Sequence, residues 1–167
     1  MGERRERKYM AHFINTTFGG GTTKTWERLG EDLEEFNVEM NPMITVERSI
    51  LDEDYVYHDG YEPTASASPI YARAGSQLAN TLQGIIDGYQ FGNACLTDIL
   101  EVHLWDPYQN ITGAYHAVMR RAWVGIDSYG GDTSGYQIPF TLTIQARRVT
   151  YGYYKPSNNT FTQVSTN

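Results

Sequence analysis

The chain has 167 residues, which is enough to bury one core, so a single domain is expected. Its formal net charge of −7 argues against a protein that wraps nucleic acid tightly, because neutralising phosphates requires an excess of Lys and Arg. The single cysteine, Cys95, excludes an internal disulfide framework, and no apolar run is long enough for a membrane-spanning helix.

Three segments are expected along the chain. Residues 1–9 carry four bases and two acids with no apolar run after them, so they indicate a flexible extension and not a signal peptide. Residues 10–150 are expected to form a single β domain, and residues 151–167 a C-terminal arm. Within the domain, residues 10–30 are rich in Thr and Gly, which predicts an extended arm or loop.

An acidic stretch with strand-like alternation follows. Residues 31–54 contain nine acids and one base. Residues 36–40 alternate apolar and polar side chains, which predicts a half-buried strand that ends at Pro42. The alternation resumes at residues 44–47, so the Asn-Pro pair marks a bend within a longer strand or a hairpin. Residues 55–57 predict a further short strand.

The strongest helix signal comes after a long polar segment. Residues 60–75 contain two prolines among Ser, Thr and Ala, which predicts a loop, with an edge strand as the alternative. The helix is indicated by one apolar stripe at helical spacing, made of Leu78, Leu82, Ile85, Ile86 and Tyr89. Ser76 is the candidate N-cap, Ser68 the alternative start and Gly88 the candidate stop. The stripe is expected to pack against one face of a sheet.

The second half of the chain predicts three strong strands. Residues 99–105, 121–126 and 138–147 alternate apolar and polar side chains, and residues 128–136 predict a hairpin turn between the last two. The whole pattern therefore indicates a mainly β protein, α+β in composition, with one helix.

No catalytic, metal or cofactor site is expected. The four histidines do not stand at metal-ligand spacing, and no cysteine joins them. The glycines at 19–21 lack the Gly-Lys-Ser/Thr ending of a phosphate loop. Residues 132–135 resemble an aspartic-protease triplet only with an inserted residue. The 13 tyrosines could form a platform for sugars or bases, although Tyr in strands is more often a packing residue.

Four blocks of the sequence carry a resemblance to a known family. They are, in order, ERLGEDLEEFNVEMNP, HDGYEPTASASPIYARAGSQLANTLQGIIDG, LTDILEVHLWD and SYGGDTSGYQIPFTLTIQARRV. In this order they resemble the major tail tube proteins of tailed phages that infect Gram-positive bacteria. The resemblance covers residues 10–149. Residues 1–9 and the segment after Tyr151 fall outside it.

The resemblance implies a tail-tube fold, with a β-sandwich or barrel-like body and one flanking helix, and a structural protein without enzymatic activity. Copies of the family form hexameric rings that contribute strands to a continuous inner β-barrel. The rings stack into the tail tube of the virion, through which genomic DNA passes during ejection without specific binding. Assembly would take place in the host cytoplasm, with the tape measure, terminator and tail tip proteins as further partners and no membrane or cofactor.

The resemblance also gives roles to two sets of residues. The residues expected to face the lumen are Glu39, Glu47, Thr143 and Gln145. The residues expected in an inter-subunit loop are Tyr61, Glu62, Pro63, Thr64, Ser66 and Ser68. An acidic bore would let DNA slide, because like charges prevent sticking. The alternative role of the acids is to keep the outer surface hydrated.

Rival functions remain open. One is a tail terminator or neck protein, which caps the tube and does not polymerise. Another is a carbohydrate-binding β-sandwich of a tail tip. A single exposed cluster of Trp26, Trp105 or Trp123 would favour sugar binding, whereas burial of all three would favour the tube. A hydrolase, the third alternative, would show convergent acids in a cleft.

Overall fold

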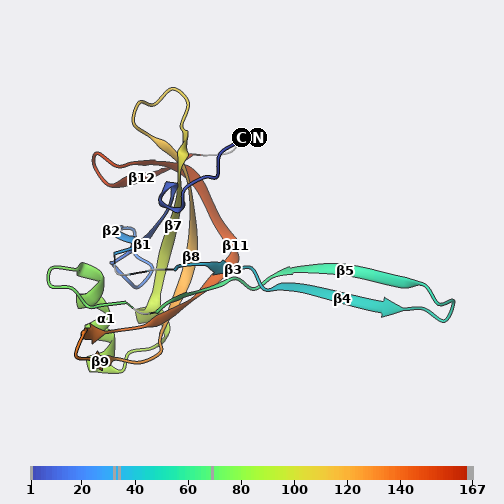
Figure 1. Ribbon diagram of the computed structural model, residues 1–167, viewed down its shortest axis with the longest axis horizontal. Coiled ribbons are helices and arrows are strands. Elements are labelled where there is room, and N and C mark those ends of the chain that lie inside the picture. The colour runs from blue at the N-terminus through green and yellow to red at the C-terminus, as the bar shows by residue number, and fades with distance from the viewer. Residues whose placement is uncertain (1, 32, 34, 69, 165–167) are drawn as a thin grey trace.

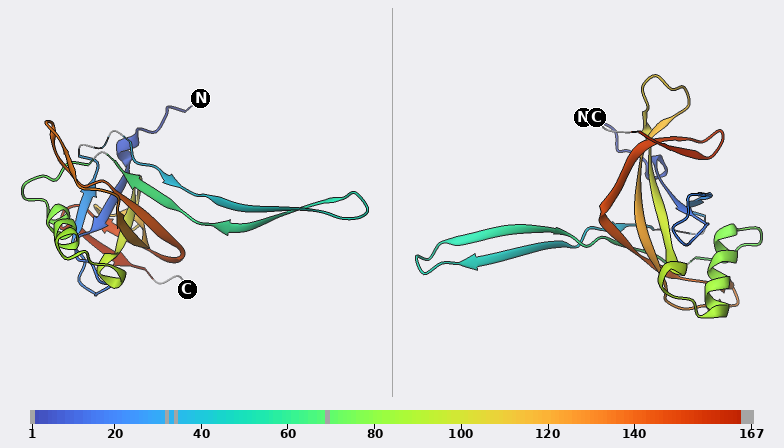
Figure 2. Two further views of the ribbon diagram at one scale, coloured as in Figure 1. Left: turned by 90° about the horizontal axis from the view of Figure 1, so that it is seen from below. Right: turned by 180° about the vertical axis from the view of Figure 1, so that it is seen from behind.

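The computed structural model describes residues 2–31, 33, 35–68 and 70–164, and it shows a mainly β protein with one helix beside its sheet (Figure 1). The predicted fold class, a mainly β body with one flanking helix, is confirmed. A long two-stranded hairpin extends from this body, as all three views show (Figures 1 and 2).

The body is built on one eight-stranded antiparallel sheet. Its strands are β1 (Met10–Asn15), β2 (Trp26–Leu29), β3 (Val38–Glu39), β6 (Thr64–Ala67), β7 (Leu96–Pro107), β8 (Tyr115–Ile126), β11 (Phe140–Lys155) and β12 (Thr160–Gln163). The spatial order is β2-β1-β7-β8-β11-β6-β3, and β12 pairs with β11. Two hairpins stand apart from this sheet: β4 (Pro42–Arg48) with β5 (Asp54–Tyr61), and β9 (Gly130–Asp132) with β10 (Gly135–Gln137). The second of these confirms the predicted hairpin turn.

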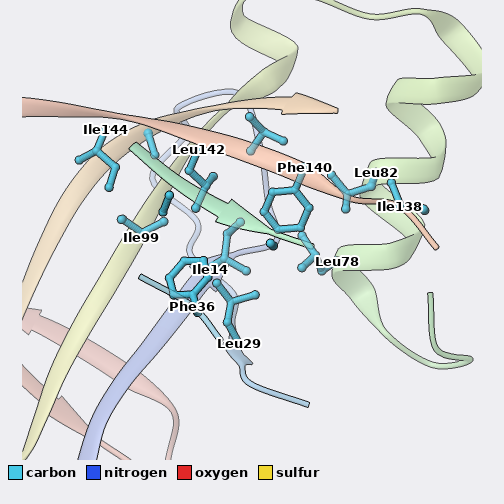
Figure 3. Packing of buried hydrophobic residues seen from close by; sticks show 14 of the residues in the cluster. Ile14, Leu29, Phe36, Leu78, Leu82, Ile99, Ile138, Phe140, Leu142 and Ile144 are labelled. Carbon is cyan, nitrogen blue, oxygen red and sulfur yellow. The ribbon is translucent and has the colours of Figure 1, made fainter. Parts of the chain in front are cut away.

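Both faces of the sheet carry a core, because successive side chains of a strand point to opposite faces. Phe13, Leu100 and Met119 are cross-strand partners on one face, and Ile14 and Ile99 are partners on the other. The cluster on the helix side includes Ile14, Leu29, Phe36, Leu78, Leu82, Ile99, Ile138, Phe140, Leu142 and Ile144 (Figure 3). The cluster on the opposite face contains Ala11, Phe13, Trp26, Leu100, Val102, Ala117 and Tyr154.

The helix α1 (Gln77–Gly88) covers the first of these clusters. Leu78, Leu82, Ile85 and Ile86 are all buried, as the stripe predicted. Ser76 is the N-cap, and its Oγ accepts from the Ala79 amide at 3.2 Å. Tyr89 was wrongly expected in the stripe: it is the C-cap in a left-handed conformation, with φ of 44°, and is 79% exposed. Because the backbone leaves the helix at Tyr89, its side chain no longer follows the helical spacing that aligns the other four.

Two segments expected to be loops contain strands of the main sheet. Residues 10–30 hold β1 and β2, and β1 lies between β2 and β7 with Ala11 through Asn15 buried. β1 was missed because a strand with cores on both faces shows no alternation. Residues 60–75 hold β6, which pairs with both β11 and β3. Its small side chains, including the buried Ala65 and Ala67, gave no strong strand signal.

Residues near the start and near the end of the described chain contact the body. At the start, η1 (Arg7–Tyr9) is a 3₁₀ turn, and the Arg7 guanidinium donates to the Phe36 carbonyl at 2.9 Å. At the other end, the expected boundary at residue 150 falls inside β11, and residues 160–163 pair with it as β12. Asn159, in the turn between them, donates to the Trp26 carbonyl at 2.8 Å. This contact links the β11–β12 hairpin to β2.

Candidate interaction surfaces

The β4–β5 hairpin, called the hairpin arm here (residues 42–61), is the most exposed element of the protein. At about 3.3 Å per residue, the seven residues of β4 extend roughly 23 Å. The two strands are in register from Pro42–Tyr61 to Arg48–Asp54, with one irregularity after Met43. At the tip, residues 49–53, the Ser49 hydroxyl accepts from the amides of Leu51 and Glu53 at 3.2 and 3.3 Å. Side-chain bonds of this kind stabilise a tight turn.

Every residue of the arm is exposed except Ser49 and Gly60, which are half-buried. Its exposed large apolar and aromatic residues are Met43, Ile44, Val46, Ile50, Leu51, Tyr55, Val56, Tyr57 and Tyr61. Pairing places Ile44, Val46 and Val56 on one face. A two-stranded hairpin alone is marginal in water, and contiguous exposed apolar surface marks an interaction site. The arm therefore has an apolar face that no other described part of its own chain covers.

The residues expected to face the lumen do not all lie together. Glu39, Thr64 and Thr143 form one row across β3, β6 and β11, on the face opposite the helix. Gln145 follows Thr143 on the same side of β11, and both are exposed. Glu47 lies on the hairpin arm instead, away from this sheet. The structure thus groups Glu39, Thr143 and Gln145 on one open sheet face and separates Glu47 from them.

The residues expected in an inter-subunit loop belong to the base of the arm and to β6. Tyr61 ends β5, and Pro63 is buried. Thr64 and Ser66 lie in β6, and Ser66 is exposed on the same face as its partner Thr141. Ser68 is exposed and follows β6 directly. The expected loop over residues 60–75 is interrupted by β6, whereas residues 62, 63, 68 and 70–75 lie outside the named strands.

The sequence carries a partial signal for the arm. Alternation at residues 44–47 and 55–57 predicts strands, with a hairpin as one alternative, and both strands are present. The apolar pair Ile50 and Leu51 lies between them.

The three tryptophans do not form one cluster. Trp26 is buried in the second core, and Trp105 is half-buried between the His103 ring at 4.8 Å and the Arg5 guanidinium at 4.1 Å. Trp123 is 37% exposed and lines an apolar groove of about 510 Å³ together with Phe91 and Tyr129. The three tryptophans therefore form neither a single exposed cluster, which would favour sugar binding, nor a fully buried set, which would favour the tube.

The described residues offer little acid–base chemistry. No group of three His, Cys, Asp or Glu among them could hold a metal ion. Burial lowers the pKa of His12 from 6.5 to about 4, and the nearby Arg7 guanidinium acts in the same direction. Burial raises the pKa of the Cys95 thiol, which disfavours the reactive thiolate. His12 and Cys95 lie in different parts of the fold, on β1 and at the end of η2 (Gly92–Cys95).

Within the part of the chain that the structure describes, no helix is long and apolar enough to cross a membrane. No protein-family model matches the sequence, and no curated protein matches it either.

Proposed function

We propose that this protein is a structural subunit that assembles with copies of itself into rings and tubes, in the manner of the major tail tube proteins that its sequence resembles. It would act in the virion as a wall around passing DNA and not as a catalyst. The observation that carries the proposal is the hairpin arm, whose apolar side chains are exposed on both strands and at the tip.

The surface area of the subunit supports this proposal. A compact monomer of 19.0 kDa is expected to expose about 8,400 Å². The chain exposes 10976 Å², an excess of roughly 2,600 Å² over that expectation. Stable protein–protein interfaces bury about 1,200–2,000 Å² in total. The excess is therefore large enough for contacts with more than one neighbouring copy.

The open sheet face supports a lining role. Thr64, Ser66, Thr141, Thr143 and Gln145 present hydroxyl and amide groups from β6 and β11 on one side of the sheet. These five side chains are polar and uncharged, which suits a water-filled lumen; Trp123, the cross-strand partner of Thr143, and Arg121 lie on the same face. In a ring of copies, joining these faces edge to edge would give a continuous polar wall.

Assembly of the full chain is the direct test. The wild-type protein should form rings or tubes, seen by negative-stain microscopy and by a concentration-dependent rise in sedimentation coefficient. A variant in which residues 43–60 are replaced by an Asn-Gly turn, which closes the hairpin at the Pro42–Tyr61 pair, should remain a folded monomer. A matched control, Phe91→Ser, removes an 88% exposed aromatic outside the arm and should still assemble.

Two results would contradict the proposal. One is a wild-type protein that stays monomeric at every concentration reached. The other is unchanged assembly of the armless variant. The ring images also distinguish a tube subunit from a terminator or neck protein, which would give single rings that do not stack.

Carbohydrate binding is the second candidate, and the aromatic groove favours it. Phe91, Trp123 and Tyr129 line this groove, and stacking on aromatic faces is how sugars are commonly held. A protein that stays monomeric while its tryptophan fluorescence responds to added oligosaccharides would support this function over the tube.

A further inference from the structure

A cluster of bases lies on the body of this acidic protein. Lys24, Arg121, Arg147 and Arg148 surround a hollow of about 300 Å³ whose apolar lining is Met119 and Val149; we name it the basic hollow. The bulge in β11 creates it, because the pairing with β8 is interrupted between Ile144 and Val149 and the two arginines lie in the interrupted stretch. Arg147 and Arg148 are exposed, and Arg121 is half-buried.

The charge of the basic hollow is not balanced by its surroundings. Lys24 pairs with the buried carboxylate of Asp98, which also lines the hollow. Among the residues that the structure describes, no acid lies within ion-pair distance of Arg121, Arg147 or Arg148. Four bases and one acid give the hollow a net charge of +3, in a chain of net charge −7.

The hairpin arm has the complementary character. Residues 42–61 contain five acids and one base, a net charge of −4. Arg48 pairs with Asp54 at 3.1 Å and lies 3.5 Å from Asp52, which leaves an acidic excess on the arm. Just before Asp52 the tip exposes Ile50 and Leu51, the latter by 74%. The tip therefore presents two apolar side chains beside carboxylates, and the basic hollow presents two apolar side chains beside basic groups.

We propose that the basic hollow is the docking site for the hairpin-arm tip of a second copy of this chain. The arm points away from its own body in every view, so its tip meets only another molecule (Figure 2). Arg–carboxylate pairs across the contact are strong and directional, and Met119 with Val149 receives the apolar pair at the tip. This inference rests on the proposed function and names the receiving surface for the arm.

Two other arrangements fit the charges less well. The aromatic groove beside α1 is more apolar than the basic hollow, but Asp127 lines it and would repel an acidic tip. Nucleic acid would be attracted by three free guanidinium groups, but a chain of net charge −7 offers few further bases to follow a phosphate backbone.

Charge reversal with rescue tests the docking. Arg147→Glu with Arg148→Glu should raise the critical concentration for assembly by about tenfold or more, because like charges across a contact are strongly unfavourable. Glu47→Lys with Glu53→Lys on the arm should do the same. Combining all four substitutions in one chain should restore assembly to near the wild-type concentration. Arg4→Glu with Lys8→Glu changes net charge equally and should have little effect.

The outcomes separate this inference from the proposed function. Two outcomes would overturn the docking site without contradicting the proposed tube subunit. One is that the fourfold variant does not regain assembly. The other is that the arginine double variant assembles normally while the armless protein stays monomeric. A wild-type chain that never assembles would remove both. Binding of a short DNA duplex that is lost in the arginine double variant, with assembly unchanged, would assign the basic hollow to nucleic acid instead. Circular dichroism of each variant verifies that it is folded.

Discussion

Lowering the pH should weaken this fold through His12, which is 7% exposed in the folded chain. Its Nδ1 lies 3.2 Å from an Arg7 guanidinium nitrogen, and its ring meets the Phe36 ring edge-on at 5.0 Å. Its cross-strand partner Glu101 is held by Arg120 at 3.0 Å. A protonated imidazole would be both desolvated and next to a cation, so the folded state keeps the ring neutral.

The direction and size of this change in stability follow from the pKa values of His12 in the folded and unfolded chain. The pKa is 6.5 for an ordinary histidine and about 4 in the folded chain, so between these values the unfolded chain binds the extra proton. Stability is therefore unaffected above pH 6.5, falls as the pH drops below it and levels off below 4. Between pH 7 and pH 5 the loss is about 2 kcal/mol, with a limit of about 3 kcal/mol. For a domain of this size, a loss of about 2 kcal/mol corresponds to a fall of roughly 4–8 °C in Tm.

The measurement is urea unfolding at pH 7 and pH 5 for the wild type and for His12→Gln, which keeps an acceptor for Arg7. Carboxylates that titrate nearby contribute equally to both proteins, so the difference between the two pH drops isolates His12. His58→Gln, on the exposed arm, is the matched control and should retain the full wild-type drop. An equal drop in the wild type and in His12→Gln would refute the reasoning, as would an imidazole pKa near 6.5 measured by NMR in the folded chain.

The remaining predictions concern packing and capping. Leu142→Ala removes a side chain with 0% exposure and should reduce the free energy of unfolding by about 2–5 kcal/mol. Thr143→Ala, on the exposed side of the same strand, should change it by about 0.5 kcal/mol or less. Equal effects of the two substitutions in urea titrations would contradict the assignment of the two faces. Ser76→Ala removes the helix N-cap and the hydroxyl that donates to Glu27 at 3.0 Å, so a loss of about 1–2 kcal/mol is expected. Ser76→Asp would restore the cap but place two carboxylates together, and a full recovery of thermal stability by that variant would show that the Glu27 contact contributes nothing.

Local patterns predicted those parts of the fold whose partners are close in sequence. The helix was readable because Leu78, Leu82, Ile85 and Ile86 repeat at its own period and Ser76 caps it. The second half of β8 and the first half of β11 were readable because apolar and polar side chains alternate there. In contrast, β1 owes its position to distant partners on β2 and β7, and burial of both its faces removes the alternation that would reveal it.

The hairpin arm shows a different limit of sequence reasoning. Alternation at residues 44–47 and 55–57 indicated strands that bury one face, and those strands exist. The pattern states that a face must be covered, but it does not state which molecule covers it. The basic hollow was equally hidden, because Lys24, Arg121 and the pair Arg147–Arg148 come together only through the bulge in β11 and the pairing of β7 with β8.

The tip of the arm also divides the chain into two pieces that need no covalent link. The segment up to Arg48 supplies β1, β2 and β3, and the segment from Ser49 onward supplies the helix and every other strand of the main sheet. A cleavage after Arg48 breaks none of the hydrogen bonds that join β1 to β7 or β3 to β6. The two fragments can therefore complement each other as one folded body. For the same reason, a peptide tag or fluorophore inserted at the tip would report on the neighbourhood of the arm without disturbing the sheet that carries it.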